Sequence, residues 1–139
     1  MQIKQIHSAF IMPTKSTQQA GAFDVYMPTS GIADENSQLV ALGFAAAVPN
    51  GHVALLLPRS GVGAKHGVEL NNTCGVIDAD YRGEWMAAIR TKSGSSYGWH
   101  TGDRLIQFLI VPIANVSLER VKELDSTTRG TGGFGSSGT

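Results

Sequence analysis

The segment that decides the fold class reads Leu39-Val-Ala-Leu-Gly-Phe-Ala-Ala-Ala-Val48, then Pro49-Asn50-Gly51, then His52-Val-Ala-Leu-Leu-Leu57. Two apolar runs flank three residues that favour a tight turn, and this arrangement predicts a β-hairpin. No segment of the chain keeps apolar residues at helical spacing over the length that a stable helix needs. The segment therefore predicts β-structure, and the rest of the chain repeats its pattern.

Seventeen glycines and many other turn signals separate short runs of apolar and β-branched residues. We expect a second hairpin at Asn71–Gly75 and at most one short helix, at Ser60–Lys65 after Pro58. The expected fold is all-β, a jelly-roll-like sandwich or barrel of short strands. The predicted strands are Gln2–Ile6, Phe23–Tyr26, Leu39–Val48, His52–Leu57, Val68–Leu70, Glu84–Thr91, Arg104–Val111 and Val116–Leu124.

Length and charge limit the function classes. The chain has 139 residues, 42% of them hydrophobic, which is typical of one globular domain. Eleven basic residues balance eleven acidic ones, so no nucleic-acid partner is expected. The apolar run Leu42–Val48 is too short to cross a bilayer, so we expect no membrane partner. Cys74 is the only cysteine, and with no signal pattern at the N-terminus we expect a cytoplasmic protein, or one in the host cytoplasm if viral.

Two nearly continuous apolar stretches favour an oligomer. Leu105–Val111 and Ala45–Val48 carry apolar side chains on both faces of a predicted strand. In so small a domain, such faces are covered most simply by another subunit.

The C-terminal segment Arg129–Thr139 combines one cation, one aromatic ring, two serines and several glycines. Ordering a glycine-rich segment has a large entropy cost. Backbone N–H groups, hydroxyls and a guanidinium suit polyphosphate oxygens, and Phe134 offers a ring for a base to stack on. We interpret the segment as a flexible lid over a nucleoside polyphosphate; by composition alone it is equally a linker or an added tag.

Five polar, glycine-marked clusters interrupt the β pattern. They are Ala20–Tyr26, Pro58–Gly67, Gly75–Glu84, Gly102–Gln107 and the C-terminal segment. In order and spacing they resemble the five motifs of the trimeric dUTPase family, the dUTP nucleotidohydrolases, over Ala20 to Thr139. Ala22 stands where the family often has glycine. The resemblance implies a dUTPase-like fold with a domain at 1–128 and a lid at 129–139. It further implies a homotrimer with shared sites that hydrolyses dUTP to dUMP and pyrophosphate with Mg²⁺.

The third cluster holds the candidate base. Asp78 follows apolar Val76 and Ile77, so its carboxylate is expected to emerge at a strand end, where it can orient a water and accept its proton. The alternative is a carboxylate that caps a turn or pairs with Arg82. The resemblance assigns attack on the α-phosphorus to the Asp78-bound water and sugar packing to Tyr81, although a tyrosine packed in the core is the alternative for that ring.

The predicted turn around Asn72 is the candidate uracil reader. Fixed backbone groups and one amide can match the pairing edge of uracil and leave polar atoms unpaired against cytosine. The resemblance assigns this role to Asn72 with the main chain of Gly75 and Val76. Alternatively, Asn72 only occupies a left-handed turn position.

The second and fourth clusters supply the candidate phosphate contacts. Arg59 offers a planar guanidinium group with paired N–H donors, and Ser60 offers a hydroxyl group. Gly61 lets the backbone come close to a phosphate oxygen. Gln107 is a polar residue in an apolar strand and needs a partner, either a phosphate or a backbone group. The resemblance favours phosphate and places Ser60 at the oxygen between the α- and β-phosphates.

The remaining roles also come from the resemblance. Mg²⁺ is expected on the substrate phosphates and water, with no direct protein ligand and Asp24 at most in its outer coordination sphere. Arg129 is expected at the γ-phosphate and Phe134 over uracil, on a neighbour's pocket. Asp78, Ser60, Gln107 and Arg129 are the candidate catalytic residues. The further lid contacts are expected from Gly133, Gly135, Ser136 and Ser137.

Two other functions stay open from the sequence. One is a dCTP deaminase-related enzyme of the same superfamily. The other is a nucleotide-gated interaction or signalling protein, for which the polar stretch Gly31–Gln38 is the candidate surface.

Overall fold

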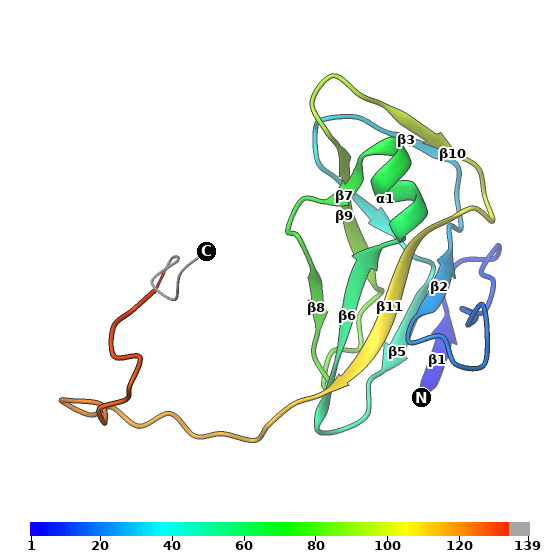
Figure 1. Cartoon of the computed structure of the whole chain (residues 1–139). Helices are drawn as coiled ribbons and strands as arrows, with labels where there is room; N and C mark the ends of the chain where they lie inside the picture. The colour runs from blue at the N-terminus through cyan, green and yellow to red at the C-terminus, as the bar shows by residue number, and fades with distance from the viewer. Residues whose placement is uncertain (134–139) are drawn as a thin grey trace.

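The computed structural model describes residues 1–133 and confirms an all-β chain with a single short helix in that range (Figure 1). Eleven strands form in the described residues, each short and bounded by turns. They are β1 (Gln2–Gln5), β2 (Phe23–Tyr26), β3 (Gly31–Ala33), β4 (Gln38–Ala41), β5 (Phe44–Ala47), β6 (His52–Pro58), β7 (Val68–Leu70), β8 (Gly75–Ile77), β9 (Met86–Thr91), β10 (Tyr97–Trp99) and β11 (Arg104–Pro112), with helix α1 (Ser60–His66) between β6 and β7.

The strands form small antiparallel sheets around one core, a jelly-roll-like arrangement. The largest sheet has the order β2-β11-β6-β8, a second has β4-β9-β7, and β1-β5 and β10-β3 form two-stranded sheets. Phe44, Trp85 and Phe108 meet between them, with Trp85 contacting Phe44 at 5.1 Å and Phe108 at 5.2 Å between ring centroids. The core thus joins residues from distant parts of the chain and gives the loops a rigid support.

The predicted helix is confirmed and extends one residue further than expected, to His66. Gly67 ends the helix in the left-handed region at φ 68°, and its N–H donates to the carbonyl oxygen of Gly63. Lys65 and His66 lie in the last turn, where positive charge is favourable next to exposed carbonyl groups.

The single strand predicted at Leu39–Val48 is wrong. The structure has two strands there: β4 pairs with β9, and β5 pairs with β1. Gly43 lies between them with φ 80°, which turns the chain from one sheet into the next, and its N–H donates to Glu84 Oε1 at 3.0 Å. The break is therefore set by one glycine inside an apolar run.

Neither predicted turn makes a hairpin. Pro49–Gly51 is a tight turn, but β5 pairs with β1 whereas β6 pairs with β11 and β8. Asn71–Gly75 likewise connects β7, which pairs with β9, to β8, which pairs with β6. In both places the turn carries the chain from one sheet to another, so its two flanking strands do not bond to each other.

Three short strands, β3, β8 and β10, were not predicted, and one of them explains part of the stretch Gly31–Gln38. Strand β3 pairs with β10. Beyond it, Glu35 accepts hydrogen bonds from the Ser93 hydroxyl at 2.8 Å and the Gly94 N–H at 3.1 Å, and these bonds lower the pKa of its carboxyl group. The stretch is thus tied to the loop between β9 and β10.

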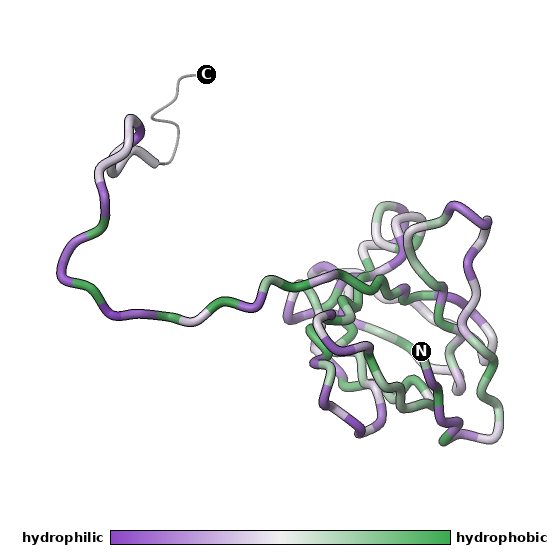
Figure 2. Tube along the Cα trace, turned by 90° about the horizontal axis from the view of Figure 1, so that it is seen from below, coloured by the Kyte–Doolittle hydropathy of each residue, from purple (hydrophilic) through white to green (hydrophobic). Residues whose placement is uncertain are grey.

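The strand predicted at Val116–Leu124 is wrong, because the chain after Pro112 has no regular structure up to residue 133. It runs away from the domain as an extended arm (Figures 1 and 2). We call residues 113–133 the arm. A strand needs a neighbour to bond to, and within the described residues only Ile113 of the arm bonds to the domain, through its N–H to the Gly51 carbonyl oxygen at 2.9 Å. Val116, Leu118 and Leu124 are exposed along it, Leu118 by 98%. Among residues 1–133, no helix has the length and apolarity to span a membrane.

Candidate functional site

Asp24 and Arg59 form an ion pair that includes a buried carboxylate. Asp24 lies on β2 and is buried, and its Oδ1 accepts from Arg59 Nε at 2.8 Å. Its other oxygen, Oδ2, accepts from Arg104 Nη1 at 3.1 Å. Two guanidinium groups satisfy the buried carboxylate, and Arg59 follows β6 directly, so the pair joins β6, β2 and β11.

Four predicted residues from the second and fourth clusters surround one cavity with Asp24. Arg59, Ser60, Gly61 and Gln107 line a polar cavity of about 430 Å³ at the start of α1. Gln107 Nε2 donates to the Pro58 carbonyl oxygen at 3.2 Å, so this amide has a backbone partner while it lines the cavity. We call this the Arg59 cavity.

The candidate base lies in a second, smaller cavity. Val76, Ile77, Asp78, Tyr81 and Met86 line about 180 Å³ beside β8. Asp78 is exposed directly after β8, as expected from the strand end. We call this the Asp78 cavity.

Arg82 does not pair with Asp78. Its Nη1 donates instead to the carbonyl oxygens of Ala79 at 2.7 Å and Tyr81 at 2.9 Å. The Tyr81 hydroxyl donates to the Glu84 carbonyl oxygen at 3.1 Å, and its ring is partly exposed rather than in the core. The loop therefore holds Tyr81 beside Asp78 with backbone hydrogen bonds.

Asn72 lies exposed on the turn between β7 and β8. Thr73, not Asn72, takes the left-handed position at φ 64°, so the alternative explanation of Asn72 is wrong. The Thr73 N–H donates to the Leu70 carbonyl oxygen at 2.8 Å and closes the turn. Gly75 is buried against Leu56, where an added Cβ would lie 3.0 Å from the Leu56 side chain. The turn is thus fixed at both ends, with Asn72 exposed between them.

A single chain keeps the two cavities apart. On one side of β6, Gln107 of β11 is paired with Leu57. On the other side, Ile77 of β8 is paired with Ala54, so that the next residue, Asp78, is level with Val53. With about 3.3 Å per residue along a strand and about 4.8 Å between strands, the Cα atoms of Gln107 and Asp78 are roughly 16 Å apart. Figure 1 shows β8 and β11 on opposite sides of β6.

Part of the predicted lid lies on the arm. Arg129 is exposed, and its Nε donates to the Gly132 carbonyl oxygen at 2.9 Å. Gly133 is exposed, and this end of the arm is far from the domain in Figure 1. The predicted contacts from Phe134, Gly135, Ser136 and Ser137 lie outside the described residues.

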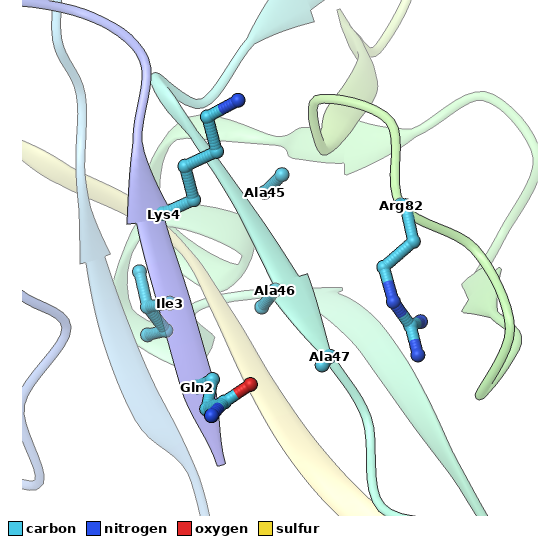
Figure 3. A pocket seen from close by; sticks show the side chains of 7 residues that line it. All are labelled: Gln2, Ile3, Lys4, Ala45, Ala46, Ala47 and Arg82. Carbon is cyan, nitrogen blue, oxygen red and sulfur yellow. The ribbon is translucent and has the colours of Figure 1, made fainter.

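A further cavity of about 600 Å³ lies over β1 and β5 and contains no predicted site residue (Figure 3). Ala45, Ala46 and Ala47 of β5 are among the residues that line it, together with the basic residues Lys4 and Arg82. It belongs to neither the Arg59 cavity nor the Asp78 cavity.

The described residues contain no cluster of three or more histidine, cysteine or carboxylate side chains able to hold a metal ion. Asp24 is the carboxylate that lines the Arg59 cavity, and both its oxygens already accept from arginines. This donor set fits an ion carried by substrate oxygens and water better than one held directly by the protein.

Sequence reasoning missed several residues of the Arg59 cavity. Arg104 does not line the cavity itself, but it pairs with Asp24, which is far away in sequence. Lys65, His66 and Tyr97 do line it. Their position in the second cluster was a signal for the first two, whereas Tyr97 is brought there only by the pairing of β10 with β3.

Known proteins resemble this chain along nearly its whole length. A model of the dUTPase family matches residues 8–138. The deoxyuridine 5'-triphosphate nucleotidohydrolase of Shewanella oneidensis is 40% identical over 139 residues, covering 97% of this chain and 91% of that protein. The enzyme of the same name from Syntrophotalea carbinolica is 38% identical over 141 residues, covering 99% and 96%. The dUTPase of Staphylococcus bacteriophage 80alpha, solved with dUPNHPP, superposes with a TM-score of 0.92 at 26% identity and covers 99% of this chain and 98% of that one.

Proposed function

The chain belongs to the dUTPase family, and from that premise we propose that it hydrolyses dUTP to dUMP and pyrophosphate. The reaction lowers dUTP and supplies the precursor of dTMP. The observation that carries the proposal is the Arg59 cavity, where residues from three of the five matched motifs converge on a polar space next to a buried carboxylate. Such a cavity suits the oxygens of a polyphosphate.

Asp78 is the proposed base. It orients a water in line with the α-phosphorus and accepts the proton as the water attacks, so that the bond to the bridging oxygen breaks and pyrophosphate leaves. The exposure of Asp78 beside Tyr81 supports this role, because water and substrate can both reach it. Ser60 donates to the bridging oxygen as that oxygen gains negative charge.

Arg59, Gly61, Gln107 and Arg129 are the remaining proposed phosphate contacts. Arg59 and Gln107 lie on the cavity wall, and Arg129 on the arm reaches the γ-phosphate. Mg²⁺ bound to the phosphates and water supplies charge neutralisation there. Asp24 is placed to accept hydrogen bonds from such waters, in the outer coordination sphere of the ion.

The base and sugar are selected at the Asp78 cavity. Asn72 and the main chain of Gly75 and Val76 read the pairing edge of uracil, and the ring of Tyr81 packs on the sugar and excludes a 2′-hydroxyl. The closed turn at Thr73 and the exposed Tyr81 ring support these roles. Phe134 then covers the base, with Gly133, Gly135, Ser136 and Ser137 as further lid contacts.

We propose that the active enzyme is a homotrimer with shared sites. The separation of the two cavities within one chain supports this, because one substrate has to meet both Asp78 and Ser60. The arm supports it too, since its apolar side chains need cover that a single chain does not give. With a single cysteine and therefore no internal disulfide, we place the enzyme in the cytoplasm.

The decisive experiment incubates the protein with dUTP, dCTP, dTTP or UTP and Mg²⁺ and identifies the products by chromatography, with ammonia measured in parallel. We expect dUMP and pyrophosphate from dUTP and little product from the other three. Release of ammonia from dCTP would instead identify a deaminase-related enzyme. No product from any nucleotide, in a folded protein that binds a dUTP analogue, would favour a nucleotide-gated interaction protein.

A further inference from the structure

The Asp24 carboxylate links two arginines, of which only Arg59 is a proposed substrate contact. Asp24 is 6% exposed, and each of its oxygens accepts from a different guanidinium group. A buried carboxylate that is shared in this way fixes the relative positions of both partners, because moving either one leaves part of the charge without a hydrogen bond.

Arg59 is anchored through two nitrogen atoms of its guanidinium group. Its Nε donates to Asp24 Oδ1 and its Nη1 to the Arg104 carbonyl oxygen at 3.2 Å. A guanidinium group has about five N–H donors, so roughly three stay available for phosphate oxygens. The backbone N–H of Arg59 also donates to the Leu105 carbonyl oxygen at 2.8 Å. Both side chain and backbone of Arg59 are therefore held by Asp24 and the start of β11.

Arg104 is itself held in place from two directions. The pairing of β11 with β2 shifts register between Arg104 and Ile106, and a bulge of this kind changes the direction in which a side chain points. The Arg104 guanidinium lies over the Tyr26 ring at 5.8 Å, and the Tyr26 hydroxyl contacts Thr14 Oγ1 at 2.8 Å. The Arg104 side chain is thus packed on Tyr26 and directed to Asp24.

We propose that Arg104 is a positioning residue, which acts through Asp24 to hold the Arg59 guanidinium in the orientation that receives the substrate phosphates. The proposal rests on the proposed function, in which Arg59 contacts phosphate. Because Arg104 binds one oxygen of Asp24, the carboxylate group does not rotate to offer both of its oxygens to Arg59. Arg59 therefore keeps its remaining N–H groups directed into the cavity. It touches no substrate in this scheme.

The test compares Arg104→Met with Arg90→Met, a matched control. Arg90 is also a half-exposed arginine in an ion pair, with Glu69 at 2.8 Å, but it lies on β9, outside the Arg59 cavity. We expect Arg104→Met to lower kcat/KM for dUTP about tenfold and the affinity for non-hydrolysable dUpNHpp by a similar factor. Affinity for deoxyuridine, which has no phosphate, should change less than about twofold by NMR titration. Arg90→Met should change none of these.

A double-mutant cycle identifies the route of the effect. In an Arg59→Met background, the further change Arg104→Met should cost less than about twofold in dUpNHpp affinity, because the side chain it positions is gone. Arg104→Lys, which keeps a donor and the charge, should restore most of the loss and serves as the second variant if Arg104→Met folds poorly. Full additivity in the cycle, or an equal loss of deoxyuridine and dUpNHpp affinity, would overturn the proposal. If the wild-type protein does not hydrolyse dUTP at all, the proposed function fails instead.

Discussion

At the scale of single residues, Asp78 carries the chemistry of the proposed reaction. We predict that Asp78→Asn lowers kcat about 10²- to 10⁴-fold, the range that a general base contributes, while dUpNHpp affinity stays within about threefold. Steady-state kinetics and titration calorimetry measure the two quantities. The matched control is Asp80→Asn, an exposed carboxylate two positions along the same loop, which should keep near-normal turnover. Near-wild-type turnover of Asp78→Asn would falsify the assignment.

Gly83 offers a second test at this scale, because it sets the space for the Tyr81 ring. A Cβ on Gly83 would overlap the ring and hydroxyl of Tyr81. Gly83→Ala should therefore displace the ring and lower the ratio of kcat/KM for dUTP over UTP by about tenfold. Gly98→Ala is the control, since a Cβ there meets nothing closer than 3.9 Å. An unchanged ratio in a folded Gly83→Ala protein would argue that the ring does not select the sugar.

At the scale of elements, the break between β4 and β5 depends on Gly43. Any other residue is strained at φ 80°, and a Cβ there would lie 3.1 Å from His7 and from Pro28. We predict that Gly43→Ala lowers the free energy of unfolding by about 1–3 kcal/mol, measured by urea denaturation. The control is Gly21→Ala, where a Cβ meets no atom within 4 Å. Equal stability of the two variants would contradict this account of the break.

The loop of Glu35 gives an element-scale prediction on pH. Hydrogen bonds from Ser93 and Gly94 lower the pKa of Glu35 in the folded protein. The folded state therefore binds fewer protons, and the stabilisation is present above the ordinary pKa of glutamate and lost as the pH falls through the lowered value. Tm of Glu35→Gln should lie below wild type at pH 7, with a gap that shrinks in acid. Glu119→Gln, an exposed change on the arm, should show no gap at either pH.

How well an element could be predicted depends on how far apart in the sequence the residues lie that determine it. Runs such as Phe23–Tyr26 and Val68–Leu70 and the helix after Pro58 depend on local pattern, and the sequence predicted them. Which strand pairs with which depends on contacts across the whole chain, so both turns were mistaken for hairpins. Short strands such as β10 carry too few residues to show a period.

The candidate site, too, could be predicted from the sequence only where its residues are close together along the chain. The cluster around Arg59 was predicted because its residues are close in sequence and match a motif. The pairing of Arg104 with Asp24 was not, because only the β2–β11 contact brings these side chains together. The separation of Asp78 from Gln107 also depends on strand order and could not be predicted from spacing.

At the scale of the whole molecule, shared sites predict complementation between two inactive variants. One variant carries Asp78→Asn with a complete lid, and the other keeps Asp78 but ends after Thr128. Each alone should form folded trimers with little activity, checked by light scattering, because the arm lies outside the core. Trimers formed from an equal mixture should regain roughly a quarter of wild-type activity, since each site needs Asp78 from one variant and the lid from the other. Mixtures as inactive as their components would mean that each site is built within one chain.

The two tight turns that join separate sheets also have a consequence for how fast the chain folds. A hairpin nucleates early because its strands are neighbours along the chain, but here β1 must find β5 and β2 must find β11 across long intervening segments. The chain loses the entropy of closing these long loops before the strands form any hydrogen bonds with each other, so refolding should be slow for a protein of this length. The transition state for folding should already contain pairs of strands that are distant in sequence.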